Sequence, residues 1–387
     1  MFANDFDPLK RRLYAATFSD AASIWSGADI RTLSASDVPR ADLWTASFPC
    51  TDLSLAGGRG GIHRGQSGAV WELLRLLKET PPASRPTALM FENVVGLLSS
   101  RTGEALGRRG EGDTDFHALV RAVNGVGYAV EPLLVDASWF TPQSRPRLYL
   151  LAEPADSRPP ADLAGVCSHP ARPPRLLAAM RSAPALRWHA RALPPLPSRA
   201  ATLESIIEDP ADGSPLWWGR ERAAYFLAQV HPGHQAEARR RIASAMTSYA
   251  TAFRRVRPCG AGGQKQSVIE LRTDGLAGCL RLPKGGSAKQ IVFRASRGAF
   301  AVRHLTPQEC GRLQGVADLG LALDPDATDG AAFSANEALT GLGDAVCVPA
   351  ARWALDVLAG AAPRGCGPER NFAASSRGRA CPAPSAR

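Results

Sequence analysis

The chain has no run of about 20 apolar residues, no basic-then-apolar amino terminus and no Cys-x-x-Cys pair. Without such a run, a membrane-spanning helix of ordinary length is not expected. Without a signal pattern in the opening residues, export is not expected. The eight cysteines lie far apart, which argues against a zinc site and a disulfide framework. We therefore expect a cytoplasmic, reduced protein that binds neither a metal ion nor a membrane.

What the chain does have is enough length and apolar content for a large domain and a smaller one. It has 387 residues, of which 45% are hydrophobic. As far as residue 155, strand-like and helix-like stretches alternate, which predicts a doubly wound, Rossmann-like α/β sheet. The expected strands lie at 43–48, 88–91, 128–135 and 147–152, and the expected helices at 69–77 and 116–123.

Past residue 152 the composition shifts to proline, alanine and arginine, followed by short helices, hairpins and glycine loops. This change predicts a second, smaller mixed domain. Helical patterns return between residues 303 and 358. The last residues are rich in proline, serine, arginine and glycine, which is typical of a disordered tail. The predicted boundaries are 1–155, 156–300, 301–360 and 361–387.

The net charge of +10 is concentrated in the middle of the chain. Residues 156–300 hold 22 Lys and Arg against 10 Asp and Glu, a net of +12, and the remainder has a net of −2. A local excess of this kind indicates a polyanionic partner, with nucleic acid favoured over an acidic membrane. An arginine-rich composition with no partner is the alternative. Most aromatic residues of this segment are expected in a small-domain core rather than stacked on bases.

Cys50 is the first candidate for chemistry. It follows Pro49 at the end of the predicted strand at 43–48 and precedes a glycine-rich loop. Proline ends the strand and presents the next side chain at the sheet edge, where ligands bind in open α/β sheets. A thiol at that edge is a candidate nucleophile. For an isolated cysteine, a small packed residue is the commoner outcome, so the rest of the chain decides between the two.

A carboxylate and two arginines accompany other predicted strands. Glu92 comes just after a buried strand, where a glutamate fits a functional site better than a core. Arg145 and Arg147 lie two residues apart before the last strand. In an extended chain both side chains share one face, so both can point at one ligand. Two arginines on a solvated edge are the alternative.

The order and spacing of these segments strongly resemble the DNA (cytosine-5) methyltransferases. Segments 273–280 and 285–290 also resemble the end of the recognition domain of bacterial members. The resemblance covers roughly residues 1–155 and 268–358 and implies a class I methyltransferase sheet with a smaller target-recognition domain. The matching motifs are Pro-Cys at 49–50, Glu-Asn-Val at 92–94, Gln-x-Arg-x-Arg at 143–147 and Leu-Thr-Pro-x-Glu-x-x-Arg-Leu-Gln-Gly at 305–315.

The resemblance also implies a reaction. The Cys50 thiolate would add to C6 of a cytosine flipped out of duplex DNA, after which C5 takes a methyl group from S-adenosylmethionine. Glu92 would hold the N3 and amino edge of the ring. Arg145, with Arg147 second to it, would stabilise the adduct and orient the thiol.

The donor site is implied by shorter matches near both ends of the chain. In that comparison Asp5 binds the ribose hydroxyls and Phe6 stacks on adenine. The first strand of the family and its Phe-x-Gly-x-Gly turn are not found, so either the true start lies upstream or this copy is truncated. The expected donor contacts are Asp5, Phe6, Asp29, Ile30, Pro49, Val70, Asp344 and Ala345.

Double-stranded DNA is the partner that the resemblance and the basic segment both imply. We expect a monomer near the nucleoid, working with a cognate restriction endonuclease or alone. Two other interpretations stay open: a catalytically silent DNA-binding homologue, and a tRNA cytosine-5 methyltransferase, against which the large basic insert argues. The expected DNA contacts are Arg59, Arg64, Arg239, Arg240, Arg241 and Lys289.

Overall fold

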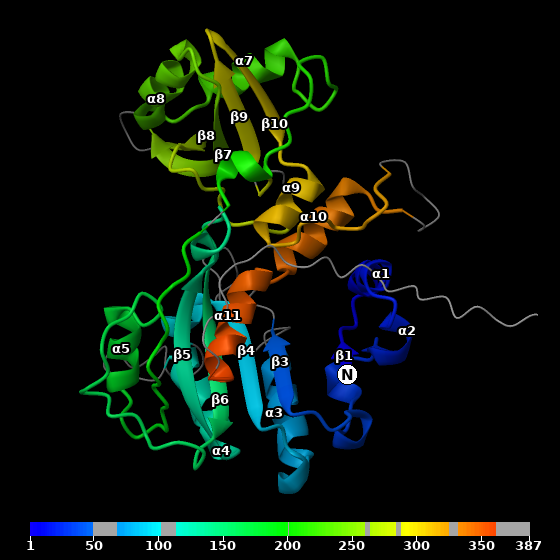
Figure 1. Ribbon diagram of the computed structural model, residues 1–387, viewed down its shortest axis with the longest axis vertical. Coiled ribbons are helices and arrows are strands. Elements are labelled where there is room, and N and C mark those ends of the chain that lie inside the picture. The colour runs from blue at the N-terminus through cyan, green and yellow to red at the C-terminus, as the bar shows by residue number, and fades with distance from the viewer. Residues whose placement is uncertain are drawn as a thin grey trace, which may run out of the picture.

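The computed structural model describes residues 1–48, 68–101, 114–199, 201–259, 264–283, 288–324 and 332–360. Its two larger sheets, each four-stranded, lie in the lower and upper halves of Figure 1. Between them lie α9 (Pro307–Leu313) and α10 (Ala335–Asp344). Of the described helices, none is long and apolar enough to span a membrane. The predicted α/β class is confirmed.

The lower sheet is mixed. β3 and β4 run parallel because a crossover helix, α3 (Ala69–Glu79), separates them in the sequence. β6 runs antiparallel to both its neighbours, β4 and β5. The connection from β5 to β6 is too short for a crossover helix, so β6 returns as a hairpin partner. The strand order is β3 (Leu43–Ser47), β4 (Ala88–Val94), β6 (Pro146–Pro154) and β5 (Tyr128–Asp136).

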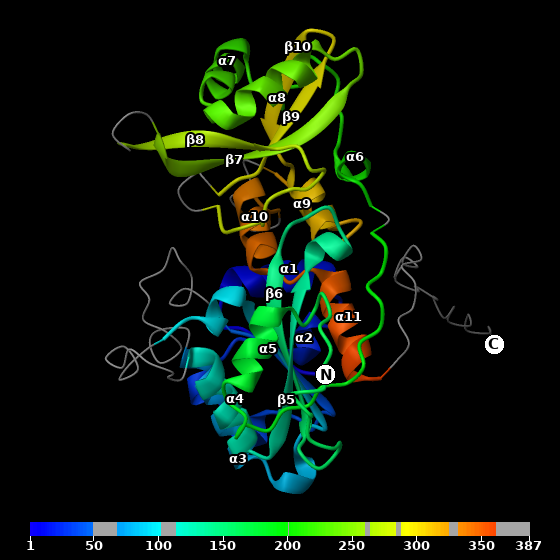
Figure 2. The same cartoon turned by 90° about the vertical axis from the view of Figure 1, so that its left-hand side faces the viewer.

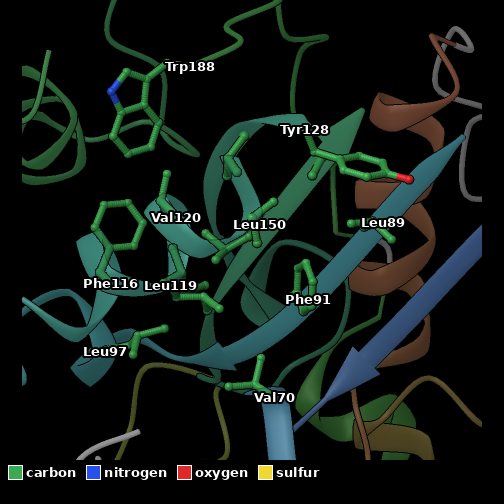
Figure 3. Close-up of a cluster of buried hydrophobic side chains, with 14 of the residues drawn as sticks. Val70, Leu89, Phe91, Leu97, Phe116, Leu119, Val120, Tyr128, Leu150 and Trp188 are labelled. Atoms are coloured by element: carbon green, nitrogen blue, oxygen red, sulfur yellow. The ribbon is translucent and has the colours of Figure 1, made fainter. Parts of the chain in front are cut away.

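Helices cover both faces of the mixed sheet (Figure 2). Leu89 and Phe91 of β4 lie in the core beneath α3 and α4 (Asp115–Gly125), as Figure 3 shows. Met90, between them, lies in a second core against α11 (Val348–Leu358). This alternation is the period-two pattern of a strand that is buried on both faces. The last described helix, α11, therefore packs on the face of the sheet opposite α3 and α4.

A buried ion network ties the chain after β6 to the mixed sheet. α5 (Pro174–Arg181) joins the core beside α4. The fully buried Glu131 of β5 accepts hydrogen bonds from the guanidinium groups of Arg172 and Arg191, and from the backbone N–H of Arg191 at 3.0 Å. Two arginines of the basic segment therefore serve an internal carboxylate.

The amino-terminal residues form a small parallel pair, β1 (Ala3–Asn4) with β2 (Trp25–Ser26). They are connected by α1 (Pro8–Thr17) and α2 (Ala21–Ile24). Within the described residues this pair makes no ladder with the mixed sheet, and β3 is bonded to β4 alone. Leu43 on that edge is 38% exposed. As far as the described residues go, the mixed sheet thus has an unpaired edge at β3.

The upper sheet is antiparallel throughout. α7 (Arg220–Ala228) and α8 (Pro232–Ala243) contribute to its core, in which Phe226 and Phe293 stack with their ring centroids 6.1 Å apart. A short helix, α6 (Leu203–Ile206), precedes them. β7 and β8 pair into a ribbon that projects sideways in Figure 2. The strand order is β10 (Ala299–His304), β9 (Ile291–Ser296), β7 (Ser248–Cys259) and β8 (Gln264–Arg272).

Replacing Glu131 with alanine should lower the free energy of unfolding by about 3–5 kcal/mol, because two buried guanidinium groups lose their counter-charge. Asp212→Ala, which removes a surface partner of Arg294, is the control and should change it by less than about 1 kcal/mol. Urea denaturation followed by tryptophan fluorescence measures both. Equal losses would show that the network contributes no more than a surface pair.

Candidate active site

Two strand ends meet at one carboxylate. Ser47, the last residue of β3, is the register partner of Glu92 on β4, and its hydroxyl donates a hydrogen bond to Glu92 Oε2. Asn93 donates from Nδ2 to the carbonyl of Phe48 at 3.0 Å. These bonds fix the end of β3. Outside the described residues lie four expected site residues: Pro49, Cys50, Arg59 and Arg64.

Arg147 completes an ion pair with this carboxylate. It stands on β6, the neighbour of β4, and its Nε lies 3.1 Å from Glu92 Oε1. Both side chains are largely buried, so solvent ions screen their attraction little. With Ser47 on one oxygen and Arg147 on the other, Glu92 is held in one orientation. We expected Arg145 as the principal arginine; of the two, Arg147 is the one that contacts Glu92.

Arg145 makes a separate set of contacts. Its side chain is 3% exposed. Nη1 donates to the carbonyl of Leu280 at 2.8 Å, and Nη2 donates to the carbonyls of Gly343 at 3.1 Å and Ala345 at 2.7 Å. Arg145 thereby joins the start of β6 to the segment after β8 and to the end of α10.

Two buried glutamines extend this joint. Gln143 donates from Nε2 to the carbonyl of Leu313 at 2.9 Å and accepts from the backbone N–H of Leu280 at 3.1 Å. Gln314, which ends α9, donates to the carbonyl of Leu342 at 2.7 Å. Nε2 of Gln143 also lies 3.2 Å from Oε1 of Gln314. The motifs at 143–147 and 305–315 are therefore in direct contact.

Cys279 is a site residue that the motifs alone did not predict. Its Sγ lies 3.4 Å from Nη1 of Arg145 and 3.6 Å from Nη2 of Arg147. Burial by itself would raise the pKa of this thiol, but the two guanidinium groups outweigh burial, and the net shift of the pKa is downward. The signal in the sequence was its place in the segment 273–280, which gave no indication of its partners.

Two groups of expected donor residues meet beside α1. Nζ of Lys10 lies 3.2 Å from Oδ2 of Asp5 and 3.4 Å from Oδ2 of Asp344. Burial would lower the pKa of Lys10, but the two carboxylates outweigh burial, and its net shift is upward. Phe6, next to Asp5, is 58% exposed. The amino-terminal unit thus presents an aromatic ring and a carboxylate to solvent.

The remaining donor residues are scattered. Asp29 caps a short helix by accepting from the backbone N–H of Arg31 at 3.0 Å. Ile30 follows it and is partly exposed. Val70 is buried in the core at the start of α3, and the carbonyl of Ala345 is taken by Arg145. Among the described residues, no cluster of His, Cys, Asp and Glu is arranged to hold a metal ion.

This arrangement can be compared with known proteins. The family model described as C-5 cytosine-specific DNA methylase matches residues 1–354. The chain belongs to this family. The type II methyltransferase M2.BsuMI of Bacillus subtilis (strain 168) is 34% identical over 149 residues, which are 38% of this chain and 34% of that protein. M.MspI, a type II methyltransferase of a Moraxella species, is 30% identical over 156 residues, which are 39% of this chain and 32% of that protein. The methylase thus spans about a third of the length of these curated relatives.

Solved structures agree with the methylase in fold. The Dnmt2 methyltransferase of S. pombe has a TM-score of 0.51 at 16% identity, covering 92% of this chain and 90% of that chain. A variant of Spodoptera frugiperda DNMT2 has a TM-score of 0.51 at 14% identity, covering 92% of this chain and 91% of that chain. These likenesses confirm the predicted class I methyltransferase fold.

The arginines of α8 in this methylase are partly neutralised. Nε of Arg240 and Nε of Arg241 each lie 2.8 Å from a carboxylate oxygen of Glu237. Arg239 is exposed. Lys289, on another segment, donates to a side-chain oxygen of α10 at 2.7 Å. The expected DNA contacts therefore differ in how far neighbouring groups compensate their positive charge.

The ribbon β7–β8 carries a second basic surface. The side chains of Arg255 and Arg257 on β7 are 53% and 40% exposed. Both face Glu270 of β8, at 3.7 Å and 2.5 Å. One carboxylate cannot neutralise two guanidinium groups, so this face of the methylase keeps a positive charge.

Arg145→Ala should lower the free energy of unfolding by about 2–5 kcal/mol, because three backbone carbonyls lose their buried donor. Arg147→Ala should lower it less, by about 1–3 kcal/mol, because the largely buried Glu92 loses its counter-charge but keeps the hydroxyl of Ser47. Urea denaturation measures both variants. If the losses are equal, or the larger one belongs to Arg147→Ala, the structural task given to Arg145 is wrong.

Proposed function

We propose that this protein transfers a methyl group from S-adenosylmethionine to C5 of a cytosine in duplex DNA. The observation that carries the proposal is the Glu92 carboxylate of β4, held between Ser47 of β3, the strand that precedes Cys50 in the sequence, and Arg147 of β6. A carboxylate repels phosphates but accepts from the amino and N3–H edge of a base. Its type II relatives suggest work beside a restriction endonuclease or as an orphan enzyme.

Cys50 takes the first step of the proposed reaction, because C5 of cytosine is a weak nucleophile. The thiolate would form a bond to C6 while N3 takes up a proton, and the displaced ring electrons would make C5 a nucleophile. C5 would then attack the methyl carbon of the donor, whose carbon–sulfur bond breaks so that S-adenosylhomocysteine leaves. Glu92 accepts from the amino group and holds the proton at N3 while charge develops on the ring. A base then removes the C5 proton, and the returning electron pair breaks the sulfur–C6 bond and regenerates the thiolate.

The residues near α1 fit part of the methyl donor. S-adenosylmethionine supplies a methyl group on a sulfonium centre. The exposed ring of Phe6 suits stacking on adenine, and the carboxylate of Asp5 suits the ribose hydroxyls. Lys10 holds Asp5 close to Asp344, so the two ends of the proposed donor site stay together.

The position of Glu92 requires an extruded base. Glu92 and Arg147 are largely buried between neighbouring strands, and a base inside a duplex cannot bring its edge to them. Flipping the target nucleotide out of the helix solves this problem, at an unstacking cost of a few kcal/mol. The reaction therefore needs a protein surface that also holds the rest of the duplex.

The ribbon β7–β8 and α8 are the proposed duplex-binding surface. A two-stranded antiparallel ribbon fits the major groove of B-DNA. Arg255 and Arg257 on this ribbon would then reach base edges. The exposed Arg239 would instead contact phosphates, which fixes the position of the duplex without reading its sequence.

The covalent step can be tested by trapping. A pool of random duplexes carrying 5-fluorocytosine, incubated with the protein and S-adenosylmethionine, should give a complex that survives denaturing electrophoresis, because fluorine at C5 blocks the final elimination. Cys50→Ser should form none while still binding DNA. Mass spectrometry of the adduct peptide identifies the bonded residue. A complex that persists in Cys50→Ser would overturn the assignment of the nucleophile.

The two basic surfaces should respond differently to charge removal. The double variant Arg255→Gln/Arg257→Gln should weaken binding to the sequences that the protein methylates more than binding to unrelated duplexes. The loss should be roughly 5- to 100-fold per arginine that reads a base. Arg239→Gln should weaken binding to all duplexes alike and reduce the slope of log affinity against log salt by about 1. Arg272→Gln, whose charge Asp274 compensates one to one, is the matched control. Uniform effects at the ribbon would exclude base reading there.

A second function is favoured by the unpaired edge of β3 in the described sheet. Within the described residues, β1 and β2 stand apart from the mixed sheet. A donor site with an unfilled edge would bind the donor poorly, and the protein would then bind DNA without methylating it. Titration with labelled S-adenosylmethionine in the presence of duplex separates the two functions. No binding at millimolar donor supports the silent homologue, and a parallel methyl-transfer assay on tRNA tests that substrate.

A further inference from the structure

We propose that Cys279 is a positioning residue for Arg147: as a thiolate, it holds the outer end of that guanidinium while the inner nitrogen stays on Glu92. The inference rests on the proposed function of the Glu92–Arg147 pair. It adds a residue from the segment between β8 and β9, on the far side of the joint.

Arg147 is held at three nitrogens. Its Nε lies 3.1 Å from Glu92 Oε1, its Nη1 donates to the carbonyl of Pro146 at 2.9 Å, and its Nη2 lies 3.6 Å from the sulfur of Cys279. A guanidinium is planar and rigid, so anchors on different nitrogens fix its plane as well as its position. Arg145, with Nη1 3.4 Å from the same sulfur, supplies a second positive charge that favours the thiolate.

The backbone around Cys279 is bonded directly to the chain that carries the arginines. The N–H of Ala277 donates to the carbonyl of Pro142 at 2.7 Å, and the N–H of Ser144 donates to the carbonyl of Ala277 at 2.9 Å. The N–H of Leu280 donates to Gln143 Oε1 at 3.1 Å. These three bonds place the sulfur between the two guanidinium groups, so its position is built into the joint.

Of the titratable groups Cys279, Tyr149 and Cys347, Cys279 is the one whose pKa is shifted toward the charged form. Burial raises the pKa of Tyr149 and of Cys347, so both stay neutral near pH 7. The other charged groups around the joint are Asp136, whose carboxylate accepts from the backbone N–H of Arg145, and Arg281 and Asp344 on the two segments that Arg145 binds. If the thiol were protonated, it would donate to the carbonyl of Leu280 at 3.3 Å instead.

An activity measurement tests the charge of Cys279. Cys279→Ser keeps a small polar group but is neutral, so kcat should fall roughly 10- to 100-fold, the range for one charge-assisted hydrogen bond, with little change in KM for DNA. The depressed pKa means that the wild-type thiolate persists above that pKa and is lost as pH falls through it. The ratio of wild-type to Cys279→Ser kcat should therefore shrink toward acid pH. A merely structural role would leave the ratio independent of pH and would overturn the proposal.

A second measurement needs no methylation at all. The rate at which iodoacetamide alkylates Cys279 is followed against pH by mass spectrometry, in folded protein and in urea. The folded midpoint should lie below the unfolded one, and Arg147→Gln should raise it. A folded midpoint at or above the unfolded value overturns the proposal. If the wild type methylates no substrate while the midpoint is lowered, the function proposed above fails and the charge of Cys279 stands.

Discussion

A buried guanidinium bonded to three backbone carbonyls is the constraint on which the rest of this structure depends. Removing a charge from water costs several kcal/mol unless its N–H groups find acceptors. The acceptors of Arg145 belong to Leu280, Gly343 and Ala345, in segments far apart along the chain. The guanidinium of Arg145, just before β6, therefore has its three acceptors only when the segment after β8 and the end of α10 have docked against it.

That docking also assembles the charges of the site. Arg147 falls beside Glu92 because β6 and β4 are neighbours in the mixed sheet. The segment that meets Arg145 brings Cys279 between the two arginines. With Cys279 as the proposed thiolate, the groups alternate in sign from Glu92 through Arg147 and Cys279 to Arg145. In that state these four charges cancel, so a base ring can contact Glu92 without leaving a net charge stranded in a poorly hydrated place.

Part of this site could be predicted from the sequence, and the physical reasons are specific. Glu92 could be predicted because a carboxylate just after a buried strand fits a functional site better than a core. The arginine motif could be predicted because residues two apart in an extended chain share a face. The contact of Arg147 with Glu92 was not predicted, because it depends on the pairing of β6 with β4. Cys279 depends on contacts with residues 132 and 134 positions earlier, and no local pattern reports a contact of that span. The α/β class could be predicted from the alternation of strand-like and helix-like stretches. The unpaired edge at β3 in the described sheet could not, because periodicity does not tell which strands pair.

Predictions from the net charge are limited in a similar way, because a count of arginines does not tell which of them face solvent. Arg172 and Arg191 neutralise Glu131 inside the fold, and Arg303 is buried against Glu309 at 2.7 Å. Only charge that the protein leaves uncompensated creates a field that attracts a polyanion. On the ribbon β7–β8, two exposed arginines share one carboxylate. Two arginines of α8 share Glu237 in the same way, and Arg239 beside them is exposed. In the proposed function, the ribbon and α8, more than the total charge, therefore guide the approach of a duplex.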